Sequence, residues 1–200
     1  MVNTIDLFNV EHYIQDLSHW QEKIEEFVDN YDYSFYKNNR NANPTKVKQN
    51  NWISKLAEVG VAQYLMKQGY PWVEPDFRIY TKKDKSWNAD LPYDNYGYPN
   101  IHVKSCDKST CDYLRKNSND DYSWTFQYAN KNGRGGKDDI FGTDDEVALV
   151  YVPEMASRWI RLVSIIPFGT IKPLLKDPIS PRLKGIKKCL YYKDLMNESS

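Results

Sequence analysis

The chain has 200 residues, in which 27 lysines and arginines balance 27 aspartates and glutamates, so its formal net charge at pH 7 is zero. This length suits one domain with a buried core, and the charge balance means that any contact with nucleic acid must come from local clusters of charge. The sequence has no apolar run of the roughly 20 residues that a membrane helix needs. Its start also lacks the basic and apolar regions of a signal peptide, so we expect a cytoplasmic protein.

The first part of the chain has the pattern of an acidic, amphipathic helix. In residues 10–30, apolar side chains that include Ile14, Leu17 and Ile24 recur at helical spacing among glutamates and aspartates. Residues 31–46 are polar and contain Pro44, which is typical of a connector. We therefore divide the chain into an N-terminal helical segment with its connector, residues 1–45, and a core with a basic C-terminal tail, residues 46–200.

A second helix is predicted from about Thr45 to Lys67. It is apolar around most of its circumference, which indicates a position in the core, and Gly69 followed by Pro71 ends it. Glu58 stands out as an acidic residue in the middle of this apolar helix.

The rest of the chain has the composition of short strands separated by turns. The expected strands are residues 77–80, 87–93, 100–106, 124–129, 146–152 and 158–168. Residues 146–152 are nearly all apolar, so we expect them in the centre of a sheet. Two helices followed by these strands predict an α+β or mixed α/β fold.

Four residues form a candidate catalytic constellation. His102 and Lys104 are two apart on one predicted strand, so their side chains share a face. A hairpin through the turn DNYGYP would bring Asp90 close to them, and Glu58 would add a second carboxylate. Carboxylates hold hard divalent cations, and a neighbouring cation can position or activate water, so this set suits metal-assisted hydrolysis of a phosphodiester.

The order of these residues resembles the PD-(D/E)xK nuclease superfamily, in which a Glu on a helix and an Asp at a strand end precede a Lys on the next strand. The matching stretches are AEVGVAQYL (57–65), NADL (88–91) and IHVKS (101–105). The resemblance covers roughly residues 50–165. It implies a restriction-endonuclease-like mixed sheet flanked by helices, and a Mg²⁺-dependent (or Mn²⁺-dependent) DNA endonuclease of a prokaryotic cell or a phage-infected host.

The resemblance also implies roles for the residues. Asp90 would be the principal metal ligand and Glu58 an additional ligand, and Lys104 would orient the attacking water and stabilise charge on the phosphate. The family usually has Glu or Asp where this chain has His102. His102 is then a variant metal ligand, an acid or base that acts on water or phosphate, or the mark of a decayed site.

Other interpretations of the same residues remain open. Pro75-Asp76 is a literal proline-aspartate pair and a rival to Asp90, which we rank first because it directly precedes IHVKS. Glu58 could instead pair with Lys55 on the same helix, and Asp90 could simply flank a turn. Lys104 could be a charge that protects an edge strand from aggregation.

Contacts with DNA are expected from two basic regions. The glycine-rich loop supplies Lys131, Arg134 and Lys137, and the C-terminal tail supplies Lys184, Lys187 and Lys188. Cutting both strands of a duplex often calls for a two-fold homodimer. The alternative function is a catalytically decayed protein of the same fold that binds nucleic acid or a protein partner; an interaction module with aromatic surfaces is a third reading.

Overall fold

The computed structural model describes residues 12–31, 43–79, 89–127 and 141–198 of the chain. In chain order the elements are β1 (His12–Gln15), the 3-10 helix η2 (Ser18–Trp20), α1 (Gln21–Asn30), α2 (Pro44–Lys67), η4 (Asp94–Tyr96), β2 (Ile101–Asp107), α3 (Lys108–Asn117), β3 (Ser123–Gln127), β4 (Glu146–Val152), β5 (Trp159–Pro167), α4 (Phe168–Ile171), η6 (Lys172–Leu174), η7 (Pro181–Leu183), β6 (Lys187–Tyr191) and α5 (Tyr192–Glu198). The fold is mixed α+β, as the order of the patterns predicts. None of the helices in the described ranges combines the length and apolar character needed to cross a bilayer.

The main sheet of the described residues has the strand order β1-β5-β4-β2. β2 runs parallel to β4, whereas β5 pairs antiparallel with both β4 and β1, so the sheet is mixed. β4 lies inside the sheet between β2 and β5, and most of its residues are buried. The prediction that residues 146–152 form a central strand is therefore confirmed.

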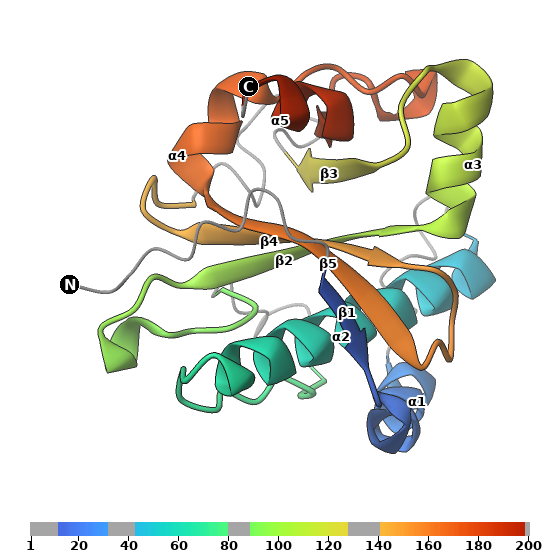
Figure 1. The fold of residues 1–200 in the computed structure, drawn as a ribbon. Helices are drawn as coiled ribbons and strands as arrows, with labels where there is room; N and C mark the ends of the chain where they lie inside the picture. The colour runs from blue at the N-terminus through green and yellow to red at the C-terminus, as the bar shows by residue number, and fades with distance from the viewer. Residues whose placement is uncertain (1–11, 32–42, 80–88, 128–140, 199–200) are drawn as a thin grey trace.

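The two faces of this sheet are covered by different elements (Figure 1). Helix α2 packs along one face, where Ile101 and Val103 of β2 join its hydrophobic core. The short β3-β6 sheet and α4 lie over the other face, where Cys106 of β2 belongs to a second core with Trp124 and Phe126. Because side chains alternate along a strand, His102 and Lys104 point to this second face.

Helix α2 begins and ends where the sequence indicates. Pro44 occupies its first turn, and the side chain of Asn43 accepts a hydrogen bond from the backbone N–H of Thr45 at 3.0 Å, which satisfies one donor at the helix start. The helix ends at Lys67, and Gly69 follows with a φ of 91°, a left-handed conformation that glycine adopts without strain.

The single helix predicted for residues 10–30 is wrong. The described part of this range instead forms β1, η2 and α1, with Ile14 of β1 paired to Ile160 of β5. Asp16 has a φ of 64°, which interrupts a right-handed helix at that point. The apolar spacing was compatible with a helix, but pairing with the edge of the sheet decided the structure of the first residues.

The described parts of two expected strands are not regular strands. Residues 77–79 form neither helix nor strand, and within residues 89–93 only Leu91 forms an isolated bridge, to Ile101 of β2. Residues 80–88 lie outside the described residues. The basic tail contains a strand that we did not expect: β6 pairs antiparallel with β3.

Candidate functional site

The expected hairpin before β2 is present as a short loop held at its base. Leu91 and Ile101 exchange two backbone hydrogen bonds of 3.0 Å each, and the turn between them contains η4. The side chain of Asn100 closes this turn by accepting hydrogen bonds from the backbone N–H groups of Tyr93 and Asp94, at 3.0 and 3.2 Å. The loop therefore places the residue before Leu91 beside the outer edge of β2.

Asp90 is that residue, and its carboxylate is bound to β2. Its Oδ2 accepts a hydrogen bond of 2.8 Å from the backbone N–H of Val103, the residue between His102 and Lys104. β2 is the terminal strand of its sheet, so this amide points outward from the sheet. The structure thus brings Asp90 next to the strand that contains the predicted His-x-Lys pair.

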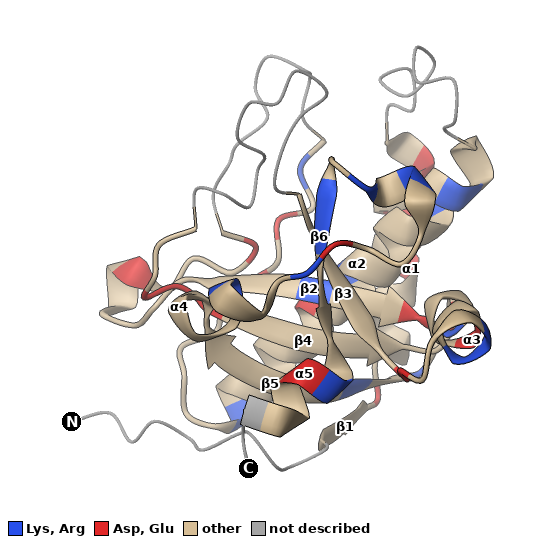
Figure 2. Ribbon diagram, turned by 90° about the horizontal axis from the view of Figure 1, so that it is seen from above, with Lys and Arg blue, Asp and Glu red and all other residues tan. Residues whose placement is uncertain are grey.

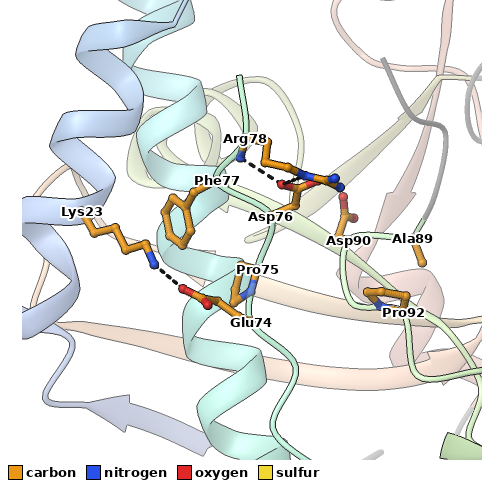
Figure 3. A pocket seen from close by; sticks show the side chains of 9 residues that line it. All are labelled: Lys23, Glu74, Pro75, Asp76, Phe77, Arg78, Ala89, Asp90 and Pro92. Atoms are coloured by element: carbon orange, nitrogen blue, oxygen red, sulfur yellow. Dashed lines mark hydrogen bonds and ion pairs between the residues drawn. The ribbon is translucent and has the colours of Figure 1, made fainter. Parts of the chain in front are cut away.

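An open pocket of about 560 Å³ lies beside Asp90 (Figure 3). It is lined by Lys23, Glu74, Pro75, Asp76, Phe77, Arg78, Ala89, Asp90 and Pro92. The lining includes three carboxylates against two basic groups, which gives the pocket a slight negative character. A volume of this size is within the range of pockets that hold small ligands or parts of larger ones.

The pocket contains the literal proline-aspartate pair together with an arginine partner. Arg78 binds the Asp76 carboxylate with two guanidinium contacts of 2.9 and 2.8 Å, and its backbone N–H donates to the same carboxylate at 2.9 Å. On the opposite side of the pocket Lys23 of α1 forms an ion pair with Glu74. Figure 3 shows Asp76, Arg78 and Asp90 gathered together, so both candidate aspartates line one pocket.

Glu58 lies on the α2 face of the sheet and is engaged by Lys55. Its Oε2 is 2.6 Å from the Lys55 ammonium, and the two side chains are only 9% and 14% exposed. The Lys55 ammonium also lies over the Phe27 and Phe77 rings, at 5.2 and 5.7 Å from their centroids. The pairing of Glu58 with Lys55 that the spacing permits is therefore formed, in a buried position rather than on an exposed helix edge.

His102 lies on the opposite face and is almost fully buried. Its ring stacks on Phe141 with a centroid distance of 3.5 Å, and its Nε2 is 3.3 Å from the Asp145 carboxylate. The other ring nitrogen, Nδ1, is buried without a hydrogen-bond partner. Burial lowers the pKa of His102 below its ordinary value of 6.5, although Asp90 and Asp145 oppose this shift.

Lys104 shares the environment of His102. Its ammonium lies 5.1 Å from the centroid of Phe141 and 5.3 Å from that of Phe126, a cation–π arrangement with two rings. The Lys104 side chain is therefore directed to the face covered by β3, whereas Glu58 belongs to the face covered by α2. Of the four predicted residues, only Asp90 lies at the strand edge between the two faces.

The predicted metal ligands Glu58, Asp90 and His102 are not assembled into one site. Within the described ranges there is no group of three or more His, Cys, Asp or Glu residues positioned to hold a metal ion. Mg²⁺, however, is commonly held by only one or two carboxylates together with water and substrate phosphates. Asp76 and Asp90 line the same open pocket, where Arg78 binds both oxygens of Asp76 and the Val103 amide binds Oδ2 of Asp90.

Only three of the six residues predicted to contact DNA belong to the described residues. Lys131, Arg134 and Lys137 lie outside the described residues. Lys187 and Lys188 belong to β6, where Figure 2 shows the basic colouring of that strand, and Lys184 precedes it. Lys188 pairs with Asp177 at 2.6 Å, so part of the positive charge of this region is neutralised within the protein.

Sequence reasoning missed four charged residues of these two environments, Lys23, Glu74, Arg78 and Asp145. Lys23 and Arg78 enter the pocket from segments that are distant in sequence, and Asp145 reaches His102 from just before β4. The only sequence signal was the proximity of Arg78 to Asp76; Lys23 and Asp145 carry no signal because their positions depend on the tertiary fold.

Comparisons of this chain with protein-family models, with curated proteins and with solved structures find no match. The assignment of a function therefore depends on the residues and the geometry described above.

Proposed function

We propose that this protein is a metal-dependent DNA endonuclease with a restriction-endonuclease-like core, restriction-like or phage-encoded in origin. The arrangement of the elements supports this proposal. Helix α2 with Glu58 is followed by the hairpin with Asp90, by β2 with Lys104 and then by α3, and β4 returns parallel to β2. Glu58, Asp90 and Lys104 thus keep the order that the resemblance to the PD-(D/E)xK superfamily implies, although Asp90 lies on a loop next to an isolated bridge and not at the end of a regular strand.

The observation that carries the proposal is the bond from the Val103 amide to the Asp90 carboxylate. This bond holds an acidic group at the outer edge of β2, at the residue that lies between His102 and Lys104 of that strand. The carboxylate also lines a pocket that is open enough for a phosphodiester and has a second aspartate, Asp76, in its wall. A purely structural hydrogen bond at a hairpin does not require such a pocket.

The residues around the pocket suit the hydrolysis of a phosphodiester. Asp90, with Asp76, would hold a Mg²⁺ or Mn²⁺ ion, which would neutralise charge on the phosphate and activate water. The slight excess of carboxylates makes the pocket repel a phosphate until a cation is bound. A strand of DNA laid across the edge of β2 would then meet Asp90 on one side and the Lys104 ammonium on the other, where Lys104 stabilises negative charge.

The test is DNA cleavage by matched variants. Wild-type protein with Mg²⁺ or Mn²⁺ is expected to cut plasmid, linear or branched DNA, and EDTA is expected to abolish the activity. Asp90→Asn removes the charge but keeps an oxygen that can accept from Val103, so the hairpin should persist. We expect its rate to fall by about two to three orders of magnitude, the size of effect found when a group that stabilises transition-state charge is lost.

The control variant is Asp94→Asn. Asp94 lies in the same hairpin but is exposed, and its carboxylate accepts a hydrogen bond only from the adjacent Asn95 N–H among the bonds described for it. Its activity should match wild type, whereas Lys104→Met should reduce cleavage. Unchanged cleavage in Asp90→Asn would remove Asp90 from the mechanism, and intact substrates with every metal would contradict the nuclease proposal for those DNA forms.

Contacts with the DNA backbone are proposed for Lys184, Lys187 and Lys188 and, from outside the described residues, for Lys131, Arg134 and Lys137.

We also propose that the protein acts as a homodimer. Sedimentation of the protein with and without duplex DNA tests this. A protein that stays monomeric on a cleaved duplex would contradict it.

A second candidate function is a decayed protein of this fold that binds nucleic acid or a protein partner. It is favoured by the engagement of Glu58 with Lys55 and of His102 with Asp145, on opposite faces of the sheet. Calorimetric titration with Mn²⁺ separates the two functions. Saturable binding that is lost in Asp90→Asn supports the nuclease, and the absence of such binding supports the decayed protein.

A further inference from the structure

Three aromatic rings form a parallel stack next to the pocket. Trp20 of η2 lies 5.8 Å from Trp72, with an angle of 26° between the ring planes, and 6.3 Å from Phe77, with an angle of 4°. Near-parallel rings at these distances are offset stacks rather than edge-on contacts. We call Trp20, Trp72 and Phe77 the aromatic stack.

The aromatic stack is continuous with the wall of the pocket and reaches the surface. Phe77 lines the pocket, and Trp72, on the other side of Trp20 in the aromatic stack, is 37% exposed. The Lys23 ammonium lies 4.9 Å from the Phe77 centroid and 5.6 Å from that of Trp20. One positive charge therefore lies where the aromatic stack meets the pocket.

Trp20 adds a second, independent observation. Its indole Nε1 is buried and has no hydrogen-bond partner. Buried indole N–H groups usually find an acceptor, so an orphaned donor within a ring stack is a feature that packing alone does not explain. This donor is covered in the structure, so an acceptor atom of a flat ligand would reach it only by displacing the side chains that cover it.

We propose that the aromatic stack is a subsite for one unpaired nucleobase of a DNA strand whose neighbouring phosphate enters the pocket. The inference rests on the proposed function and adds its substrate class: DNA that is single-stranded or unpaired near the site of cleavage. Every nucleobase has a flat π-face and ring or carbonyl acceptors, so the subsite stacks bases without strong sequence preference.

The observations favour an unpaired base over an intact duplex. In a duplex both faces of each base are covered by neighbouring bases, and only the base edges are open to side chains. A ring stack offers nothing to base edges, whereas it can cover the face of an extruded base. The pocket is also slightly acidic, so it does not offer the broad positive surface that holds a long duplex by its phosphates.

The experiment measures the affinity of the full chain for a fluorescein-labelled 12-residue oligothymidylate and for a duplex of equal length, with Ca²⁺ to suppress cleavage. We expect Trp72→Ala to weaken binding of the single strand at least about fivefold, the lower end of what the loss of one base-stacking ring costs. Trp72→Phe keeps a flat ring and should retain most of the affinity. Binding of the duplex should be weaker than that of the single strand and insensitive to both variants.

The matched control is Trp159→Ala. Trp159 is also a partly buried tryptophan in ring contacts, with Tyr13 and Tyr151, but it lies on β5 away from the pocket. Its replacement should leave the affinity for the single strand unchanged. Circular dichroism melting of each variant separates a lost contact from a lost fold.

The possible outcomes distinguish this inference from the proposed function. If Trp72→Ala binds the single strand as tightly as wild type while plasmid is still cut, the subsite is wrong and the nuclease stands. If binding depends on Trp72 but no DNA is cut, the subsite stands and the nuclease is wrong. A protein that binds neither form of DNA contradicts both, and a duplex bound as tightly as the single strand overturns the preference for an unpaired base.

Discussion

Ionisable residues have different kinds of partner on the two faces of β2. On the α2 face Glu58 and Lys55 neutralise each other inside an otherwise apolar core. On the opposite face His102 and Lys104 lie against the Phe141 ring, and Asp145 is the acidic partner of His102. Residues that sequence order brings into one motif can therefore lie on opposite faces of a sheet.

Within the described residues, the outer edge of β2 borders both environments. Asp90 is bound there through the amide of Val103, the residue whose side chain points to α2 while its two neighbours point to the other face. A reaction that uses residues from both faces must therefore take place at this edge. Variants on each face test how strongly that face stabilises its own ionisable groups.

The largest effect on stability is expected from Glu58→Ala. This change leaves the Lys55 ammonium in a largely buried place without its carboxylate, and breaking a buried pair typically costs about 3–5 kcal/mol of unfolding free energy. Urea unfolding followed by circular dichroism measures the loss. The double variant Lys55→Met with Glu58→Leu should recover most of it, because neither charge then remains buried.

If Glu58→Ala has the same urea midpoint of unfolding as the wild type, the ion pair does not hold the carboxylate in place. Glu58 would then be available as the additional metal ligand, and the separation between the two faces would be weaker than described. The cleavage rate of Glu58→Gln, compared with that of Asp90→Asn, would show whether it acts in that role.

An intermediate effect is expected from Gly60→Ala, which tests how tightly α2 packs on the sheet. A Cβ atom added at Gly60 would lie 2.1 Å from Cδ1 and 2.9 Å from Cγ1 of Ile160, a fully buried residue of β5. Overpacking of this kind costs about 1–3 kcal/mol. The melting temperature should fall accordingly.

Ile160→Val removes the methyl group that the new Cβ would strike. Combined with Gly60→Ala, it should therefore cost less than the sum of the two single changes, a coupling that a double-mutant cycle measures. Strict additivity would show that α2 shifts away from β5 instead, so that the α2 face is looser than its packing indicates.

The smallest effect is a pH dependence that originates on the other face. Because burial lowers the pKa of His102 in the folded protein, the unfolded chain binds this proton more readily. Stability should therefore decrease as the pH falls below about 6.5, the ordinary histidine pKa. His102→Gln removes this contribution, so wild type should lose more stability than the variant between pH 7.5 and 5.5.

Urea unfolding at both pH values in the presence of EDTA measures that difference. Equal losses of unfolding free energy in wild type and His102→Gln would mean that His102 has the same pKa in the folded and unfolded states. The His102 ring would then be more hydrated than its burial implies.

Much of the architecture was predictable because it depends on local patterns. Helix α2 has a cap, an apolar circumference and a glycine after its end, and β4 is a continuous apolar run. The hairpin that brings Asp90 to β2 was predictable from its turn composition. The helix expected for residues 10–30 failed because the spacing of Ile14 and Leu17 suits more than one structure, and β5 offered an edge to pair with.

The sequence by itself determined the order of the candidate residues and the boundaries of α2, and it permitted the pairing of Lys55 with Glu58, since all of these depend on neighbours along the chain. Only the tertiary structure decided which residues share a site. The pleat of β2 directs His102 and Lys104 away from α2, and the segment after α2 brings Asp76 and Arg78, instead of Glu58, to the pocket of Asp90. The physical reason is that a strand has two faces, and which face meets which helix is set by packing across the whole sheet.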